Sequence, residues 1–317
     1  MPNAWTHIIF GQLVLSKLGE NRMIAAAEQK IIFNMGSQGP DFLLFNRFYP
    51  WQKNSALKEL GNVMHNKNCG LAIMEMLDGV KGRSADPDTA DQSLLYAVAF
   101  VIHHVLDRHM HPFVYSRSGF LKWDHQRYEI MMDTILARKL ANFETISTPV
   151  WREITGELPE PIIAIYERIA RNYYEELALN IQRKDWILSF RYMLRAHKLF
   201  HDPTGLKRLF TFGLLEPFLY HRKVNYDVWN ECMLPWIDPT DNQIVHHESG
   251  WMLWERALGD AVTITRTVLQ WLRCPDEEEL PELRNAALSL IGNYSYESGL
   301  PCDSGLPIRY SEPIWLQ

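Results

Sequence analysis

The chain has 317 residues, of which 47% are hydrophobic, 22% are charged and 12% are aromatic. These proportions are typical of a globular protein with a substantial core and exclude a disordered chain. The formal net charge of −6 provides no basic surface for a nucleic-acid polymer and no polybasic membrane anchor. Four scattered cysteines without a CxxC pair argue against a disulfide framework and against a thiolate zinc site.

The amino-terminal stretch lacks the basic segment and the small-residue cleavage site of a signal peptide. No apolar run approaches the roughly 20 residues that are needed to span a bilayer. We therefore expect a cytoplasmic protein with at most peripheral membrane contact. The sequence does not indicate an oligomeric state.

Apolar residues recur at helical spacing along most of the chain, and neither strand alternation nor an internal repeat is evident. In the first half we expect helices at about 4–18, 22–33, 57–77, 90–111 and 121–140. In the second half we expect them at about 159–179, 186–200, 206–218, 250–272 and 280–291. The pattern predicts an all-α, multi-helix bundle. Residues 1–150 would form a metal-binding catalytic region, and residues 151–317 would add helices packed on it as one compact unit.

The stretch FVIHHVLDRHMHPFVY, residues 100–115, contains four histidines and one aspartate. In a helix, His103, Asp107 and His111 are spaced at i, i+4 and i+8 and drift by only about 40° per step, so they share one face. Pro112 predicts the end of this helix. Two imidazoles and a carboxylate on one buried face are typical of metal ligands.

Further candidate ligands lie on both sides of this stretch. His125 and Glu129 form another i, i+4 pair on the next helix, a spacing that lets both side chains bind one ion. His7 lies in the first turn of the first helix, and His65 lies in the third. Asp41 ends a loop rich in turn formers, and such loops often carry polar side chains to a site.

Each of these residues also has a purely structural interpretation. His7 or His65 alone would more often be a core histidine, and Asp41 could cap a helix or form an Asx turn. Glu129 could be a solvated carboxylate. His104 points about 100° away from the ligand face and is expected to pack or to orient a ligand.

The order of these residues resembles the bacterial zinc-dependent phospholipase C family, which is related to the 3′-nucleotidase/nuclease enzymes. The likeness covers residues 2–133, and beyond them only the helical character matches. Two H-x3-(D/E) pairs in order, with His and Asp upstream, form the signature. The resemblance implies an all-helical fold and two or three zinc ions. The residues it assigns to the metal site are His7, Asp41, His65, His103, Asp107, His111, His125 and Glu129.

The resemblance also implies how the ligands are shared. His65, His103 and Asp107 would hold one zinc ion. Asp107 would bridge to a second ion, held by His7 and by the amino terminus left after removal of Met1.

His111, His125 and Glu129 would hold the remaining ion. The family usually places its histidine six residues after the bridging aspartate, where this chain has Phe113. His111 is the better substitute because it stacks on the aspartate along the helix, and His109 is the alternative.

Asp41 would be the catalytic general base or an additional ligand. The implied activity is phosphodiester hydrolysis of the phospholipase C type, in which zinc-activated water attacks the phosphorus of a phospholipid or another phosphodiester. Asn3, Ala4 and Trp5 stand where the family has a choline-recognising glutamate, so a preference for phosphatidylcholine does not follow. Two alternatives remain: a nucleotide or other soluble phosphoester as substrate, or a non-catalytic helical protein with structural metals.

Overall fold

The computed structural model describes residues 4–49, 51–81 and 87–316, and this part of the chain contains twelve α-helices. Helix accounts for 62% of the structure and strand for 2%, which confirms the predicted all-α fold. The small strand content is one antiparallel hairpin of β1 (Trp236–Ile237) and β2 (Val245–His246), which the sequence pattern did not predict.

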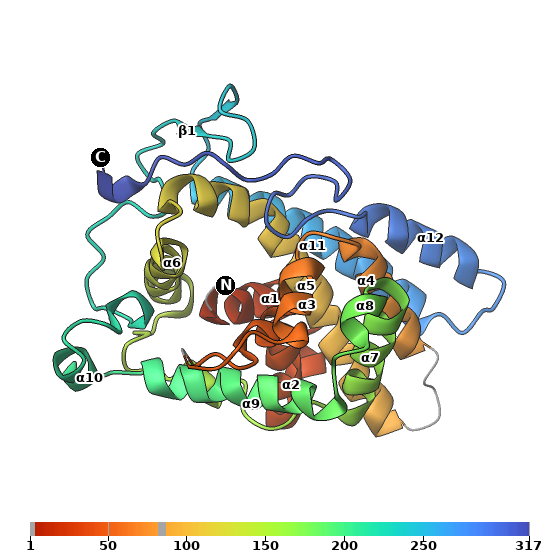
Figure 1. The fold of residues 1–317 in the computed structure, drawn as a ribbon. Helices are drawn as coiled ribbons and strands as arrows, with labels where there is room; N and C mark the ends of the chain where they lie inside the picture. The colour runs from red at the N-terminus through yellow and green to blue at the C-terminus, as the bar shows by residue number, and fades with distance from the viewer. Residues whose placement is uncertain (1–3, 50, 82–86, 317) are drawn as a thin grey trace.

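Helix α5 (Pro87–Ser118) is the centre of the bundle (Figure 1). Residues 95–102 are buried on every side because this part of the helix is apolar all round. Helices α2 (Ala27–Gly36) and α11 (Gly250–Arg273) pack along it. Helices α1 (Ala4–Leu18) and α6 (Asp124–Ala141) also contact it and each other. The histidine-rich part of α5 therefore faces α1 and α6.

The segment expected as one helix at about 57–77 is two helices, α3 (Ala56–Met64) and α4 (Cys69–Lys81). The prediction was wrong because Asn68 adopts a left-handed conformation, with φ of 55°, which ends the helical path. His65 consequently follows the last turn of α3 instead of lying on a helix face. Upstream, the helix expected from residue 22 is a short turn, η1 (Asn21–Ile24), followed by α2.

Pro112 does not end α5, which continues to Ser118, so that prediction was also wrong. Proline has no N–H to donate to the carbonyl of Arg108, but the next turn stays helical because Phe113 is fully buried in the core. Gly299 packs against the carbonyl of Arg108: a Cβ atom at this glycine, whose φ is 67°, would lie 2.3 Å from that oxygen. The carboxy-terminal segment therefore covers the proline turn closely.

The remaining elements wrap around this centre. They are η2 (Asp41–Phe45), η3 (Val150–Arg152), α7 (Glu160–Tyr173), α8 (Glu175–Ala178), α9 (Arg183–Phe200), α10 (Leu206–Phe210), η4 (Glu216–Phe218), α12 (Leu280–Ile291) and η5 (Ile314–Leu316). The expected helix at 159–179 divides at Tyr174, and the one at 206–218 is only five residues long before a turn. Buried side chains on both sides of residue 150 form one continuous core; for example, the hydroxyls of Tyr96 and Tyr166 are 2.9 Å apart.

Among the helices within the described ranges, none is both long enough and apolar enough to cross a bilayer.

Candidate metal centre

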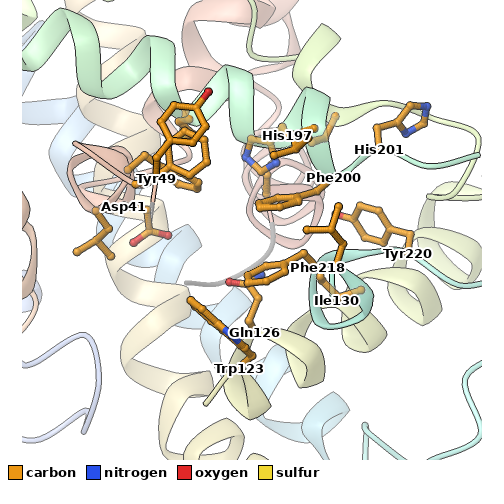
Figure 2. Close-up of a pocket in the computed structure, with 18 of the residues that line it drawn as sticks. Asp41, Tyr49, Trp123, Gln126, Ile130, His197, Phe200, His201, Phe218 and Tyr220 are labelled. Atoms are coloured by element: carbon orange, nitrogen blue, oxygen red, sulfur yellow. The ribbon is translucent and has the colours of Figure 1, made fainter. Parts of the chain in front are cut away.

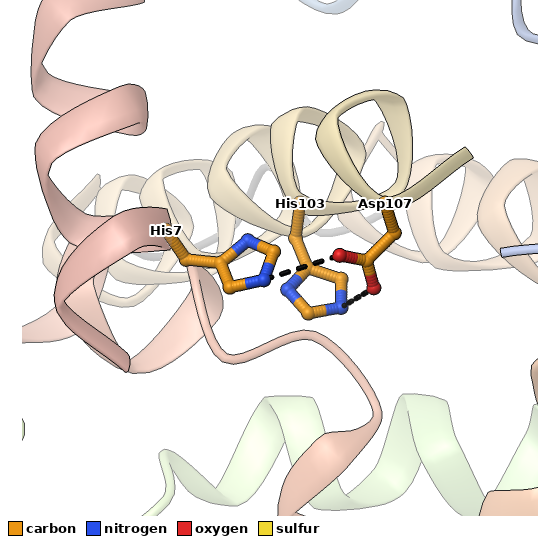
Figure 3. Close-up of side chains that lie close together, drawn as sticks. All are labelled: His7, His103 and Asp107. Atoms are coloured by element: carbon orange, nitrogen blue, oxygen red, sulfur yellow. Dashed lines mark ion pairs between the residues drawn. The ribbon is translucent and has the colours of Figure 1, made fainter. Parts of the chain in front are cut away.

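The first group of candidate ligands joins α1 to α5. Nε2 of His7 lies 3.2 Å from Oδ1 of Asp107, and Nε2 of His103 lies 3.0 Å from Oδ2 of the same carboxylate (Figure 3). The two imidazole rings stack with their centroids 4.0 Å apart. One ligand atom from each side chain falls within 4.8 Å of the others, and all three residues are buried. These residues could hold one metal ion.

The second group joins α5 to α6. Oε1 of Glu129 lies 2.8 Å from Nε2 of His125 and 3.4 Å from Nε2 of His111. These three ligand atoms also fall within 4.8 Å of one another, so the group could hold another ion. Asp107 connects the groups, because its Oδ2 is 3.9 Å from Nδ1 of His111.

A small cavity of about 30 Å³ lies between the two groups. Its polar wall includes His7, Asp107, His111 and Glu129, and methionine and leucine side chains close the remainder. The volume is sufficient for a water molecule or an ion, since a water molecule needs roughly 10–15 Å³ of such a cavity.

Backbone carbonyls fix the orientation of the ligand imidazoles. Nδ1 of His103 donates to the carbonyl of Ser37 at 2.9 Å, and Nδ1 of His111 donates to the carbonyl of Tyr296 at 2.8 Å. Because a carbonyl can only accept, each Nδ1 carries the proton, and each Nε2 presents a lone pair in the neutral ring. This second interaction of a ligand histidine is typical of metal sites.

The same geometry tests whether a cation fits. Each Nε2 lone pair faces a carboxylate oxygen at 3.0 Å for His103 and 3.4 Å for His111, so two acceptors are opposed. Such a pair needs a proton or a metal ion between its atoms. Two ligands bound at about 2.1 Å to one tetrahedral ion would be about 3.4 Å apart. Nε2 of His103 and Oδ2 of Asp107 are buried and make no hydrogen bond within the described residues, as expected of ligand atoms.

Asp41 and His65 form a separate pair. Nδ1 of His65 donates to the carbonyl of Gly61 at 2.6 Å, and its Nε2 lies 2.9 Å from Oδ1 of Asp41. The structure therefore places His103 in a group with His7 and Asp107, whereas the family pattern placed His103 with His65 and Asp107 and had Asp107 bridge to the ion held by His7.

Electrostatics in the cluster favour ionised carboxylates. Burial raises the pKa of Asp107, but the facing His103, His111 and His7 reverse this and bring it well below its ordinary value. Burial lowers the pKa of His7, and the neutral form that results is the one that binds metals. Burial also disfavours the charged form of His111, but Asp107 and Glu129 raise its pKa to about 9.

The neighbouring histidines of α5 lie outside both groups. Nε2 of His109 is 2.9 Å from Oδ2 of Asp260 on α11, and Nε2 of His104 is 2.9 Å from the carbonyl of Tyr294. Of the two alternatives left by the sequence, His111 and not His109 therefore lies beside His125. The proposed ligation by the amino terminus falls on residues 1–3, which are outside the described residues.

Sequence reasoning missed the groups that orient the ligands. The carbonyl of Ser37 belongs to the turn-rich loop that ends at Asp41. The sequence indicates that this loop carries a polar side chain to the site, but not that its backbone orients His103. Nothing in the sequence indicated the carbonyl of Tyr296. The ring of Tyr115 was also missed, and it lies 4.5 Å from that of His125.

A much larger cavity, of about 600 Å³, reaches the site at Asp41, and its lining includes none of the six residues of the two candidate groups. Asp41 and Gln38 form part of its wall, and Figure 2 shows Asp41 on one side with Phe200 and Phe218 opposite. Most of the lining is aromatic or aliphatic. Lys58 and Lys122 supply positive charge to the wall. Asp41 thus borders an apolar cleft, whereas His7, Asp107, His111 and Glu129 line the small cavity.

The fold and the site define an all-helical protein with buried groups of histidines and carboxylates that could hold metal ions. Comparison with protein-family models, with curated proteins and with solved structures found no match for this chain. Its function is therefore inferred from the site.

Proposed function

We propose that the protein is a zinc-dependent phosphodiester hydrolase of the phospholipase C type, acting on phospholipids. The observation that supports this most strongly is the position of Asp41, which lines the large apolar cavity and is close enough to His103 of the first candidate group for that histidine to lower its pKa. A phospholipid combines a phosphodiester with apolar chains, which matches the two parts of this site. A nucleotide would leave much of the apolar wall without a complementary group.

One ion would be held by His7, His103 and Asp107. Another would be held by His111, His125 and Glu129. Zinc suits this set of imidazole nitrogens and carboxylate oxygens. When bound, it would supply Lewis-acid stabilisation of the phosphoryl oxygens and water with a pKa near 7.

Asp41 would accept the proton of the attacking water. Burial raises its pKa, but the facing His65 and His103 lower it overall, so the carboxylate is ionised and able to accept. Nδ1 of His65 donates to the carbonyl of Gly61, which orients the ring so that its Nε2 lies 2.9 Å from Oδ1 of Asp41. A fixed base at the border between cluster and cavity is placed where a phosphodiester would enter.

The decisive test combines metal analysis with turnover. Purified protein should contain at least one zinc or comparable divalent ion per chain and should hydrolyse monomeric short-chain phospholipids. Asp41→Asn should lower kcat by about 10²–10⁴-fold while retaining the metal, because only the proton acceptor is lost. Asp260→Asn, an exposed carboxylate on α11, is the matched control and should retain full activity.

Three results would contradict the proposal in different ways. Less than one divalent ion per chain would exclude the metal site. Turnover of nucleotides without turnover of any phospholipid head group would favour the soluble phosphoester alternative. A full complement of metal with no turnover of either class would indicate structural ions.

A further inference from the structure

The mouth of the large cavity is marked by side chains that both line it and face solvent. They include Trp51, Trp123 and Leu214, which are 78%, 46% and 79% exposed, and Leu199 of α9, which is 42% exposed. Trp51 precedes α3, Trp123 precedes α6, and Leu214 lies between α10 and η4. Because a residue in the cavity wall that is also exposed lies at the opening, these three segments surround it.

More exposed apolar side chains continue outward from two of these positions. Leu121 is 75% exposed, Phe210 is 75% exposed and Phe212 is 95% exposed. We call the set the apolar rim: Trp51, Leu121, Trp123, Phe210, Phe212 and Leu214. Single exposed apolar residues are ordinary, but several that surround one cavity mouth mark an interaction surface.

The segments that carry the apolar rim are basic, although the whole chain has a formal charge of −6. Residues 46–58, 117–123 and 203–215 contain seven lysines and arginines and no aspartate or glutamate, and the acidic residues that directly adjoin them are Glu59, Asp124, Asp202 and Glu216. Arg208 pairs with Glu216, and Nζ of Lys207 donates to carbonyls at the end of α9. Arg117 is buried, so the charge at the rim comes mainly from the remaining cations of these segments: Arg47, Lys53, Lys58 and Lys122.

Aromatic and basic side chains also occur together at the rim. Trp51 stacks on Tyr49 with centroids 4.9 Å apart, and Nζ of Lys122 lies 5.1 Å from the ring centroid of Trp123. Tryptophan and tyrosine favour the boundary between lipid and water, and lysines beside them favour anionic head groups.

From these observations we infer that the apolar rim docks on the surface of an anionic phospholipid bilayer, with the mouth of the cavity toward the lipid. This inference deepens the proposed function by stating where the substrate is taken from, but binding to the bilayer is a separate property. A second copy of the chain is a poorer occupant. In a symmetric dimer the same patch would face itself, so the rim cations would face each other.

The test is co-sedimentation with vesicles of phosphatidylcholine and phosphatidylserine at a 7:3 ratio. The double variant Phe212→Ser/Leu214→Ser should bind at least about tenfold more weakly than the unchanged protein, because it removes two of the inserted side chains. Leu179→Ser is the matched control: Leu179 is 81% exposed after α8, does not line the cavity, and should have no effect on binding. Lys53→Glu/Lys122→Glu should weaken binding to these vesicles but much less to pure phosphatidylcholine.

Thermal unfolding would verify that each variant is folded. Absence of binding by the unchanged protein, or equal binding by the Phe212→Ser/Leu214→Ser variant, would overturn the inference. The inference would also be overturned if the unchanged protein formed a dimer and the Phe212→Ser/Leu214→Ser variant were monomeric. Hydrolysis of a monomeric short-chain phospholipid, measured on the same samples, tests the proposed function independently. Hydrolysis without vesicle binding would refute the docking surface alone, and vesicle binding without hydrolysis would refute the activity alone.

Discussion

His109 and His111 are two residues apart on α5, yet they have different partners. His109 turns to Asp260 on α11, whereas His111 faces Glu129 and has its other nitrogen held by the carbonyl of Tyr296. The difference follows from the helical rotation of about 200° between i and i+2. At this scale the site depends on which side of the helix a histidine occupies and not on the local density of histidines.

We predict that His111→Gln lowers the affinity of the second candidate group for zinc by at least about tenfold, since it removes a candidate ligand and not only a supporting group. His109→Gln should leave the affinity unchanged. Titration of the metal-free proteins with zinc, followed by isothermal calorimetry, would measure both. Equal affinities of the two variants would contradict the assignment of His111.

His197 is a half-buried histidine in the wall of the large cavity, with its ring 5.8 Å from that of Phe45. Burial lowers its pKa to about 4, so it stays neutral in the folded protein while the unfolded chain takes up a proton near pH 6.5. The stabilisation that the folded protein gains from a neutral His197 is therefore complete above about pH 6.5 and is lost as the pH falls toward 4.

For this reason we predict that His197→Gln makes the free energy of unfolding less sensitive to acid. At pH 5 the unchanged protein should lose about 2 kcal/mol through His197, and the variant should not lose this part. Urea unfolding of both proteins at pH 7.5 and at pH 5 would give the difference. A constant difference between the two proteins at the two pH values would contradict the prediction.

At the scale of elements, the turn between α2 and η2 fits closely against α5. Gly39 has a φ of 51°, and a Cβ atom there would lie 2.2 Å from Cδ2 of His103. Ser37, two residues earlier, accepts the hydrogen bond from that same ring. The turn thus both holds the imidazole and leaves no room for a side chain beside it.

Gly39→Ala should therefore destabilise the fold and disturb the ligand. Gly19→Ala is the control, since Gly19 also has a positive φ, of 75°, but nothing lies within 4 Å of its added Cβ. We expect Gly19→Ala to lower the free energy of unfolding by about 1–2 kcal/mol through backbone strain alone. Gly39→Ala should lower it by about 1–3 kcal/mol more, because its Cβ atom would also clash with His103. Chemical denaturation would compare them, and equal losses would contradict the role of the close contact.

How far the sequence predicts these elements depends on whether local forces decide them. Helix α1 has the predicted bounds because its periodic apolar face and Gly19 act locally. Pro112 shows the opposite case: a local signal to end the helix is overridden by the burial of Phe113. His65 was placed on a helix because no local rule indicated the left-handed Asn68. The candidate ligands were recognisable by type and spacing, but their grouping depends on contacts between distant helices.

At the scale of the whole molecule, the site connects the start of the chain with its end. The stack of His7 on His103 joins α1 to α5, and the carbonyl of Tyr296 orients a histidine 185 residues before it. The carboxy-terminal segment is anchored there by further contacts, including Tyr296 N–H to the carbonyl of His65 at 2.9 Å. One continuous core surrounds these connections.

The late position of Tyr296 has a consequence for biosynthesis. All eight candidate ligand residues leave the ribosome well before the segment that fixes the ring of His111. During that interval the candidate ligands are present, but His111 lacks the carbonyl that fixes its orientation in the folded protein. Metal selectivity depends on geometry more than on intrinsic affinity. If the site holds an ion, its final geometry, and with it the selectivity for that ion, would therefore be set only after Tyr296 has been synthesised and has packed against His111.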